Sequence, residues 1–207
     1  MEASTTIIGR VTRCSIRGFV GGIRLTQPDI PAFGALCSAP AQRDSIHVIG
    51  LIYDISIEDD ELARQLAVAA APPPAVRADS VFNRPIPIEL SALSVGYESQ
   101  GVFHQSLPPQ PPVTLAEIRP LNPSETQRFT ERLDFLPLIL SSGQLPVDDL
   151  LAALLRGAAE ARPPAERRAF LLDAAAQCAR WMARDLMRLE TLLRNLGATT
   201  GVSGAAP

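Results

Sequence analysis

The chain has 207 residues, of which 46% are hydrophobic and 20% are charged, and this balance supports a folded core. The net charge of −3 argues against a broad nucleic-acid-binding surface, and an aromatic content of 5% is too low for base-stacking platforms. Every basic residue is an arginine, so chemistry that needs a lysine, including a Walker A loop, is excluded within this sequence.

Short apolar runs separated by turn residues predict β-strands in the first half of the chain. The predicted strands are 6–16, 19–25, 35–38, 47–57 and 86–97, with a possible sixth at 113–118. Gly9 and Gly50 stand near the starts of two similar strands, where glycine lets a strand bend at a barrel corner. Several short strands with glycine kinks favour a small closed β-barrel over an open sheet.

An acidic run at 58–61, followed by apolar residues, predicts a short helix that the prolines at 72–74 end. The same run and Asp54 form the strongest catalytic candidate, because clustered carboxylates can hold Mg²⁺ for phosphoryl chemistry. A nuclease site needs carboxylates that converge from separate elements, so an acidic helix start is the preferred interpretation. The cluster consists of Asp54, Glu58, Asp59, Asp60 and Glu61.

The segment 107–125 is rich in proline, which cannot continue a helix or a central strand, and we expect it to run extended. Beyond it, Ala, Leu, Arg and Glu at helical spacing predict a helical region. Ser124 and Gln127 form a capping-box pattern at the start of the first helix, which Pro137 kinks or ends.

A second helix is predicted to begin at Pro146 and to end before Pro163. Its apolar face consists of Leu150, Leu151, Leu154 and Leu155. One long helix is then predicted over 165–196, with Gly197 as its C-cap. Its apolar stripe consists of Leu171, Ala175, Cys178, Met182, Leu186, Leu189, Leu193 and Leu196. The stripe can pack within the chain or pair with a second copy in a homo-oligomer.

We therefore predict an α+β fold in which a small N-terminal barrel (1–120) precedes a helical domain (121–197) and a disordered tail (198–207). The start of the sequence has no signal-peptide pattern and no apolar run reaches membrane-spanning length, so we expect a cytoplasmic protein without membrane contact. The cysteines are widely spaced and odd in number, which argues against a disulfide framework or a closed zinc site.

The motif search favours a protein without catalytic, cofactor or metal residues. The two histidines are far apart: His47 begins a predicted strand and His104 lies in a predicted loop. No HExxH, GxSxG or Walker A pattern occurs. Arginines gather in two places, and arginine is enriched at protein interfaces. They are Arg10, Arg13, Arg17 and Arg24 in the first strands, and Arg162, Arg167 and Arg168 near the last helix.

Five segments in order resemble the HAS-barrel, the small barrel at the N-terminus of HerA-type DNA-translocating ATPases and of F-type ATP synthase subunits. They are IIGRV (7–11), FGALCSAP (33–40), VIGLIYDI (48–55), IELSALSVGY (88–97) and the proline-rich exit SLPPQPPV (106–113). Where that family continues into an ATPase with Walker motifs, this chain has only predicted helices, so ATP hydrolysis does not carry over.

The resemblance implies an adaptor that docks to a HerA-like ATPase or to its NurA-like nuclease partner in DNA processing. The expected contact residues lie on the barrel rim: Arg17, Phe19, Tyr97 and Phe103. Two other functions stay open. One is a barrel that binds a small ligand or a nucleotide, and the other is a metal-dependent nuclease that uses the acidic cluster.

Overall fold

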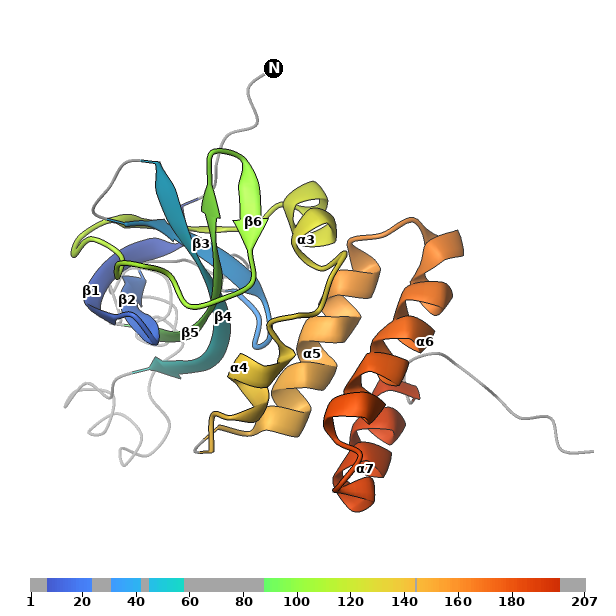
Figure 1. Cartoon of the computed structure of the whole chain (residues 1–207). Helices are drawn as coiled ribbons and strands as arrows, with labels where there is room; N and C mark the ends of the chain where they lie inside the picture. The colour runs from blue at the N-terminus through green and yellow to red at the C-terminus, as the bar shows by residue number, and fades with distance from the viewer. Residues whose placement is uncertain (1–6, 24–30, 42–44, 58–87, 144, 198–207) are drawn as a thin grey trace, which may run out of the picture.

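The computed structural model describes residues 7–23, 31–41, 45–57, 88–143 and 145–197. In these parts of the chain a β-barrel lies beside a group of helices, as Figure 1 shows. The predicted α+β class is therefore confirmed. The predicted helix after the acidic run, the disordered tail and Arg24 fall outside the described residues.

Among the described residues, six antiparallel strands close into a barrel in the order β2-β1-β7-β3-β4-β5, and pairing of β2 with β5 closes the ring. A further strand, β6, pairs with β5 alone. The strands are β1 (Gly9–Ser15), β2 (Gly18–Ile23), β3 (Leu36–Pro40), β4 (Ile46–Ile57), β5 (Ile88–Ser99), β6 (Val102–His104) and β7 (Glu117–Pro120). Five of them lie where apolar runs predicted strands.

Strand β7 overlaps the possible sixth strand predicted at 113–118, and it corrects the expectation that the proline-rich segment could not continue a central strand. It lies between β1 and β3, pairing Gly9 with Ile118 on one side and Cys37 with Pro120 on the other. Proline is tolerated there because Pro120 is the last residue of the strand and contributes no N–H to the ladder.

Strand β6 was not predicted, and His104 was expected in a loop. Instead, Val102 pairs with Ser99 and His104 with Tyr97 across a tight hairpin. Its two turn residues both have positive φ, 51° at Gln100 and 78° at Gly101, which is the backbone of a hairpin turn with right-handed twist.

The barrel interior is filled by apolar side chains from all six closing strands. Phe19 is 3% exposed and packs there with Val11, Leu90 and Ile118. Its ring lies over Gly50, where an added Cβ would come within 2.7 Å of the ring. The glycine predicted to bend a strand therefore makes room for an aromatic side chain.

The helices follow β7 without a long connection. They are α3 (Pro123–Phe129), α4 (Leu136–Leu140), α5 (Val147–Glu160), α6 (Pro164–Trp181) and α7 (Leu186–Gly197). Helix α5 begins and ends where predicted, and its four predicted apolar residues are all buried. In Figure 1, α5 stands between the barrel and α6.

The start of α3 differs from the predicted capping box. Asn122, not Ser124, is the N-cap: its side chain accepts a hydrogen bond from Glu125 N, and the Glu125 carboxylate accepts one from Asn122 N, both at 2.9 Å. Pro123 at the first helical position suits this arrangement because its missing N–H would have no partner there. Pro137 begins α4 instead of kinking α3.

The single long helix predicted over 165–196 is in fact two helices, with the break between Trp181 and Leu186. Asp185 caps the second, because its carboxylate accepts from Arg188 N at 3.1 Å. The break lets both helices pack against α5. The break also divides the predicted apolar stripe. Cys178 on α6 and Leu196 on α7 are buried, whereas Leu186 at the start of α7 is 70% exposed.

A second core joins the helices to the outside of the barrel. Ile49, Leu51 and Val95 point outward from β4 and β5 and pack in one cluster with helical residues such as Phe129 and Leu151. The predicted domain division at residue 120 falls at the end of β7, yet this cluster contains residues from both sides of it.

Arg162 ties α3, α5 and α6 together and is not an interface residue, because only 7% of it is exposed. Its guanidinium donates to the Ala158 and Thr130 carbonyls at 2.7 and 3.1 Å, and to the Thr130 hydroxyl at 3.0 Å. It also donates to the Gln127 carbonyl at 3.3 Å and lies 3.7 Å from the centre of the Phe170 ring.

Iodoacetamide at pH 8 is expected to label Cys14 first and to spare Cys37 and Cys178 until the protein unfolds. Burial raises the pKa of the Cys37 thiol to about 12 and that of Cys178 to about 11, so little reactive thiolate forms. Cys14 is only partly buried. Mass spectrometry of timed samples measures the order.

The raised pKa values of the buried thiols also make the free energy of unfolding depend on pH. Between the ordinary thiol pKa of 9.0 and about 12, the unfolded chain releases the Cys37 proton and the folded chain keeps it, so stability falls as the pH rises. Rapid labelling of either buried thiol at pH 8, before any loss of folded signal, would contradict this description.

No described helix is both long and apolar enough to span a bilayer.

Candidate functional site

Two arginines lie at the barrel rim: Arg17 in the tight turn between β1 and β2, and Arg13 near the end of β1. Ser15 fixes this turn, since its hydroxyl accepts from Arg17 N and donates to Gly18 O, both at 3.2 Å. A register shift between Val11 and Arg13 interrupts the pairing of β1 with β2. Such a bulge turns side chains away from regular alternation, and Arg13 and Arg17 both line the cleft described next.

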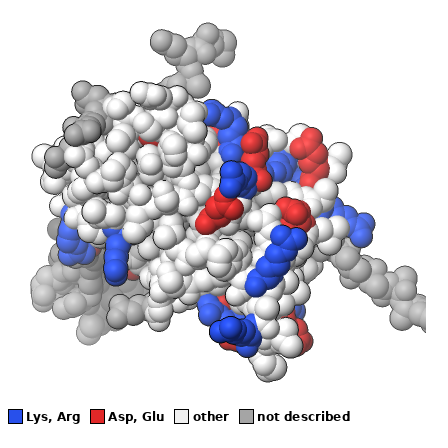
Figure 2. All heavy atoms as spheres, viewed as in Figure 1, with Lys and Arg blue, Asp and Glu red and all other residues white. Residues whose placement is uncertain are grey.

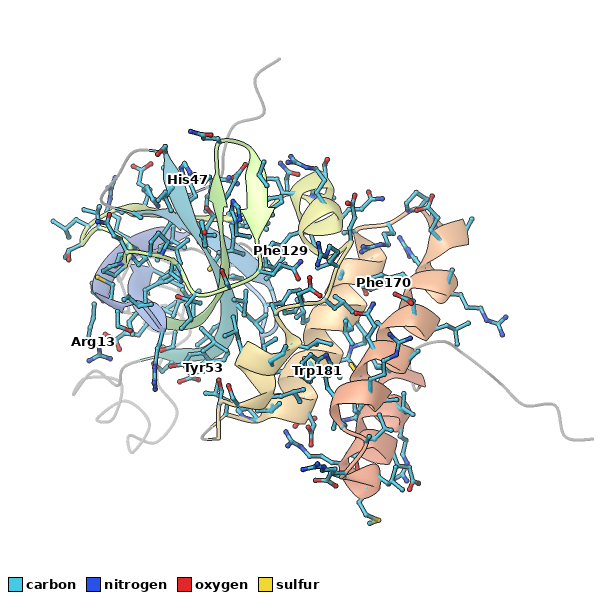
Figure 3. The ribbon with its side chains drawn as sticks, in the orientation of Figure 1. Arg13, His47, Tyr53, Phe129, Phe170 and Trp181 are labelled. Carbon is cyan, nitrogen blue, oxygen red and sulfur yellow. The ribbon has the colours of Figure 1, made fainter. Side chains whose placement is uncertain are left out.

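A cleft of about 930 Å³ lies between this turn, strands β4 and β5, and the segment that follows α4. We call it the rim cleft. Its polar side chains are Arg13, Cys14, Ser15, Arg17, Tyr53, Ser94, Ser141 and Ser142. Figure 3 shows Arg13 and Tyr53 on the same lower side of the barrel, and Figure 2 shows arginine side chains along this margin.

The rim cleft is positively charged. Neither Arg13 nor Arg17 makes a side-chain hydrogen bond or ion pair with a described residue, and no carboxylate is among the described residues that line the cleft. The hydroxyls of Ser141 and Ser142 already donate to the Leu138 carbonyl, at 3.2 and 2.8 Å. The remaining donors are therefore the two guanidinium groups and other hydroxyls.

Ser94 is the unusual member of the rim cleft. It is fully buried (0% exposed), and its hydroxyl has no hydrogen-bond partner in the described part of the chain. Its backbone N–H is satisfied by the Arg17 carbonyl at 2.9 Å, which fixes β5 against the turn. A buried hydroxyl without a partner is costly, and because this one has no accessible surface it is not open to the cleft.

The structure separates the four residues that the sequence placed on the barrel rim. Arg17 lies at the rim cleft. Phe19 is a correction: it is buried inside the barrel, because its strand alternates and the ring fills the space above Gly50. Tyr97 and Phe103 lie together on the β5–β6 hairpin, away from the cleft-lining residues.

The rings of Tyr97 and Phe103 both contact other side chains of the same chain. The Tyr97 ring stacks on His104 with centroids 4.7 Å apart. Phe103 packs edge-on against Phe129 at 5.5 Å, and the Arg128 guanidinium covers it at 5.1 Å. The Phe103 contact fastens the hairpin to α3, whereas the Tyr97 contact lies within the hairpin itself, so these half-buried rings offer little free apolar surface.

A second candidate surface lies where α6 gives way to α7. Trp181, Leu186 and Met187 are 58%, 70% and 79% exposed, and we call them the helical corner. Arg180 and Arg184 are exposed beside them and form no ion pair with any residue that the structure describes. Sequence reasoning missed this surface, although the only tryptophan of the chain marks it.

The structure describes only one residue of the predicted acidic cluster. Asp54 lies in β4 opposite Ser91, while 58–61 falls outside the described residues. Within the described ranges, no group of three or more His, Cys, Asp or Glu residues could hold a metal ion.

Comparison with known proteins adds no relative: no protein-family model matches the chain, and no curated protein matches it significantly. A small closed barrel does not by itself identify a HAS-barrel, so that resemblance stays a prediction.

Proposed function

We propose that this protein is a non-enzymatic interaction module that docks to a partner protein through its helical corner. The observation that carries the proposal is the exposure of Trp181, Leu186 and Met187 at the break between α6 and α7. Grouped apolar side chains at a surface mark interaction sites, and tryptophan and arginine are enriched among the residues that dominate binding energy.

The charges around the corner define the partner's chemistry. Arg180 and Arg184 flank the apolar side chains, so a complementary site is an apolar pocket rimmed by carboxylates. A symmetric pair of corners would bring the arginines of two copies together, which disfavours self-association through this surface. A different protein is therefore the favoured occupant, ahead of the homo-oligomer considered from the sequence.

The finer proposal is that this partner is a HerA-like ATPase or a NurA-like nuclease, in the cytoplasm and in DNA processing. It rests on the resemblance of the barrel segments and on the absence of Walker motifs from the sequence. Arg17, Tyr97 and Phe103 then offer a second contact on the barrel, which leaves the helical corner as the main anchor.

Met187→Glu is expected to weaken partner binding about tenfold or more without loss of stability. Met187 is exposed in the first turn of α7, where a carboxylate interacts favourably with the helix dipole, so folding is preserved. Sedimentation velocity with a purified HerA-like ATPase, and separately with a NurA-like nuclease, measures co-migration. Binding should also weaken with salt, because the corner is basic.

Leu115→Glu is the matched control, since Leu115 is a 67% exposed apolar residue just before β7, outside both the helical corner and the β5–β6 hairpin. It should leave co-migration intact. If Met187→Glu binds as tightly as the unmodified protein, the helical corner is not part of the interface. Self-association that Met187→Glu abolishes would show that a second copy is the occupant, and would contradict the proposal of a different partner.

A further inference from the structure

The rim cleft has the properties of a binding site that the helical corner does not use. Its two arginines have no described side-chain partner, and its described lining contains no carboxylate, within a chain of net charge −3. Two guanidinium groups beside one cleft attract an anion, and planar arginine forks match the oxygens of phosphate. We propose that the rim cleft binds a small phosphate ester through Arg13 and Arg17.

Tyr53 is a further donor in the cleft, because its hydroxyl makes no hydrogen bond to a described residue. A phenol and two guanidinium groups together offer several donors to phosphate oxygens. Ser94 also lines the cleft, but its hydroxyl is fully buried and is not open to a ligand.

The size and walls of the cleft argue for an ester instead of free phosphate. A volume of about 930 Å³ is close to that of small-molecule sites and much larger than a phosphate ion. Leu93, Leu107, Leu138 and Leu145 also line it. These side chains provide an apolar wall for an organic group, while the arginines lie at the turn.

Phenyl phosphate is the probe, with inorganic phosphate and phenol as its two halves. Isothermal titration calorimetry on the full chain should show saturable binding of phenyl phosphate, and weaker binding of each half. Arg13→Ala and Arg17→Ala should each weaken phenyl phosphate about tenfold, because each removes a charge-assisted hydrogen bond. Arg184→Ala is the charge-matched control on the far helices and should bind normally.

Ser94→Ala is a second control, because the hydroxyl that it removes is buried and not open to a ligand. Without ligand its melting temperature should equal or exceed that of the unmodified protein, since a hydroxyl without a partner is removed. The rise in melting temperature that phenyl phosphate produces should be unchanged in this variant. The proposal is overturned by absence of saturable binding at millimolar phenyl phosphate, or by unchanged affinity in both arginine variants.

Discussion

Arg162→Ala is expected to lower the free energy of unfolding by about 3 kcal/mol. The substitution removes four hydrogen bonds and the contact with the Phe170 ring, and it leaves the Thr130 and Ala158 carbonyls without their donor. A net contribution of about 1 kcal/mol per hydrogen bond, reduced by the entry of water, leads to this value. Urea denaturation followed by circular dichroism measures it.

Two variants separate geometry from charge at this position. Arg168→Ala removes the same charge from an exposed site on α6 and should change stability by less than about 0.5 kcal/mol. Arg162→Lys keeps the charge but loses the planar fork that reaches α3 and α5 together, so most of the loss should persist. A loss below about 1 kcal/mol in Arg162→Ala would show that α3 and α5 do not depend on this guanidinium.

Five of the barrel strands could be predicted because each is an apolar run between turn residues, but the direction of each side chain could not. Strand β5 shows why: Leu90 and Ala92 point into the barrel, whereas Val95 packs against the helices. A strand buried on both faces has no polar alternation to reveal which side is which. Phe19 was therefore assigned to the surface although it lies in the interior.

The break between α6 and α7 illustrates a different limit. Ala183 and Arg184 are good helix formers, so local propensity continues across the break. Asp185, followed by apolar residues at helical spacing, was the one local signal of a new N-terminus. Packing of both halves against α5 decides the outcome, and that is a tertiary property.

The rim cleft could be predicted only in part. Arg13 and Arg17 are close in sequence and stood out as a basic group. Tyr53 and Ser94 line the same cleft only because the pairing of the strands brings them there. Nothing in the sequence distinguishes Ser94 from Ser91, which is partly exposed on the same strand. The hydroxyl becomes informative only once its burial and its missing partner are known.

Gly34→Ala should destabilise the protein by about 3 kcal/mol, because it strains the backbone and separates the barrel from α5. Gly34 has φ of +82°, which costs any other residue about 1–2 kcal/mol. An added Cβ would also clash with the Ala153 side chain and come within 2.9 Å of the α5 backbone at Leu154. That contact lies beside the core that the barrel and helices share.

Gly101→Ala measures the cost of the backbone strain without the cost of a clash. Gly101 has a similar φ of +78°, but an added Cβ there would meet nothing within 4 Å, so only the backbone strain of about 1 kcal/mol applies. The difference between the two variants in urea denaturation therefore measures how firmly α5 is packed on the barrel. Adding Ala153→Gly to Gly34→Ala should recover part of that difference, since it removes one of the clashing atoms. Equal losses in Gly34→Ala and Gly101→Ala would mean that α5 moves away at little cost, and that the barrel and the helices are stable largely independently of each other.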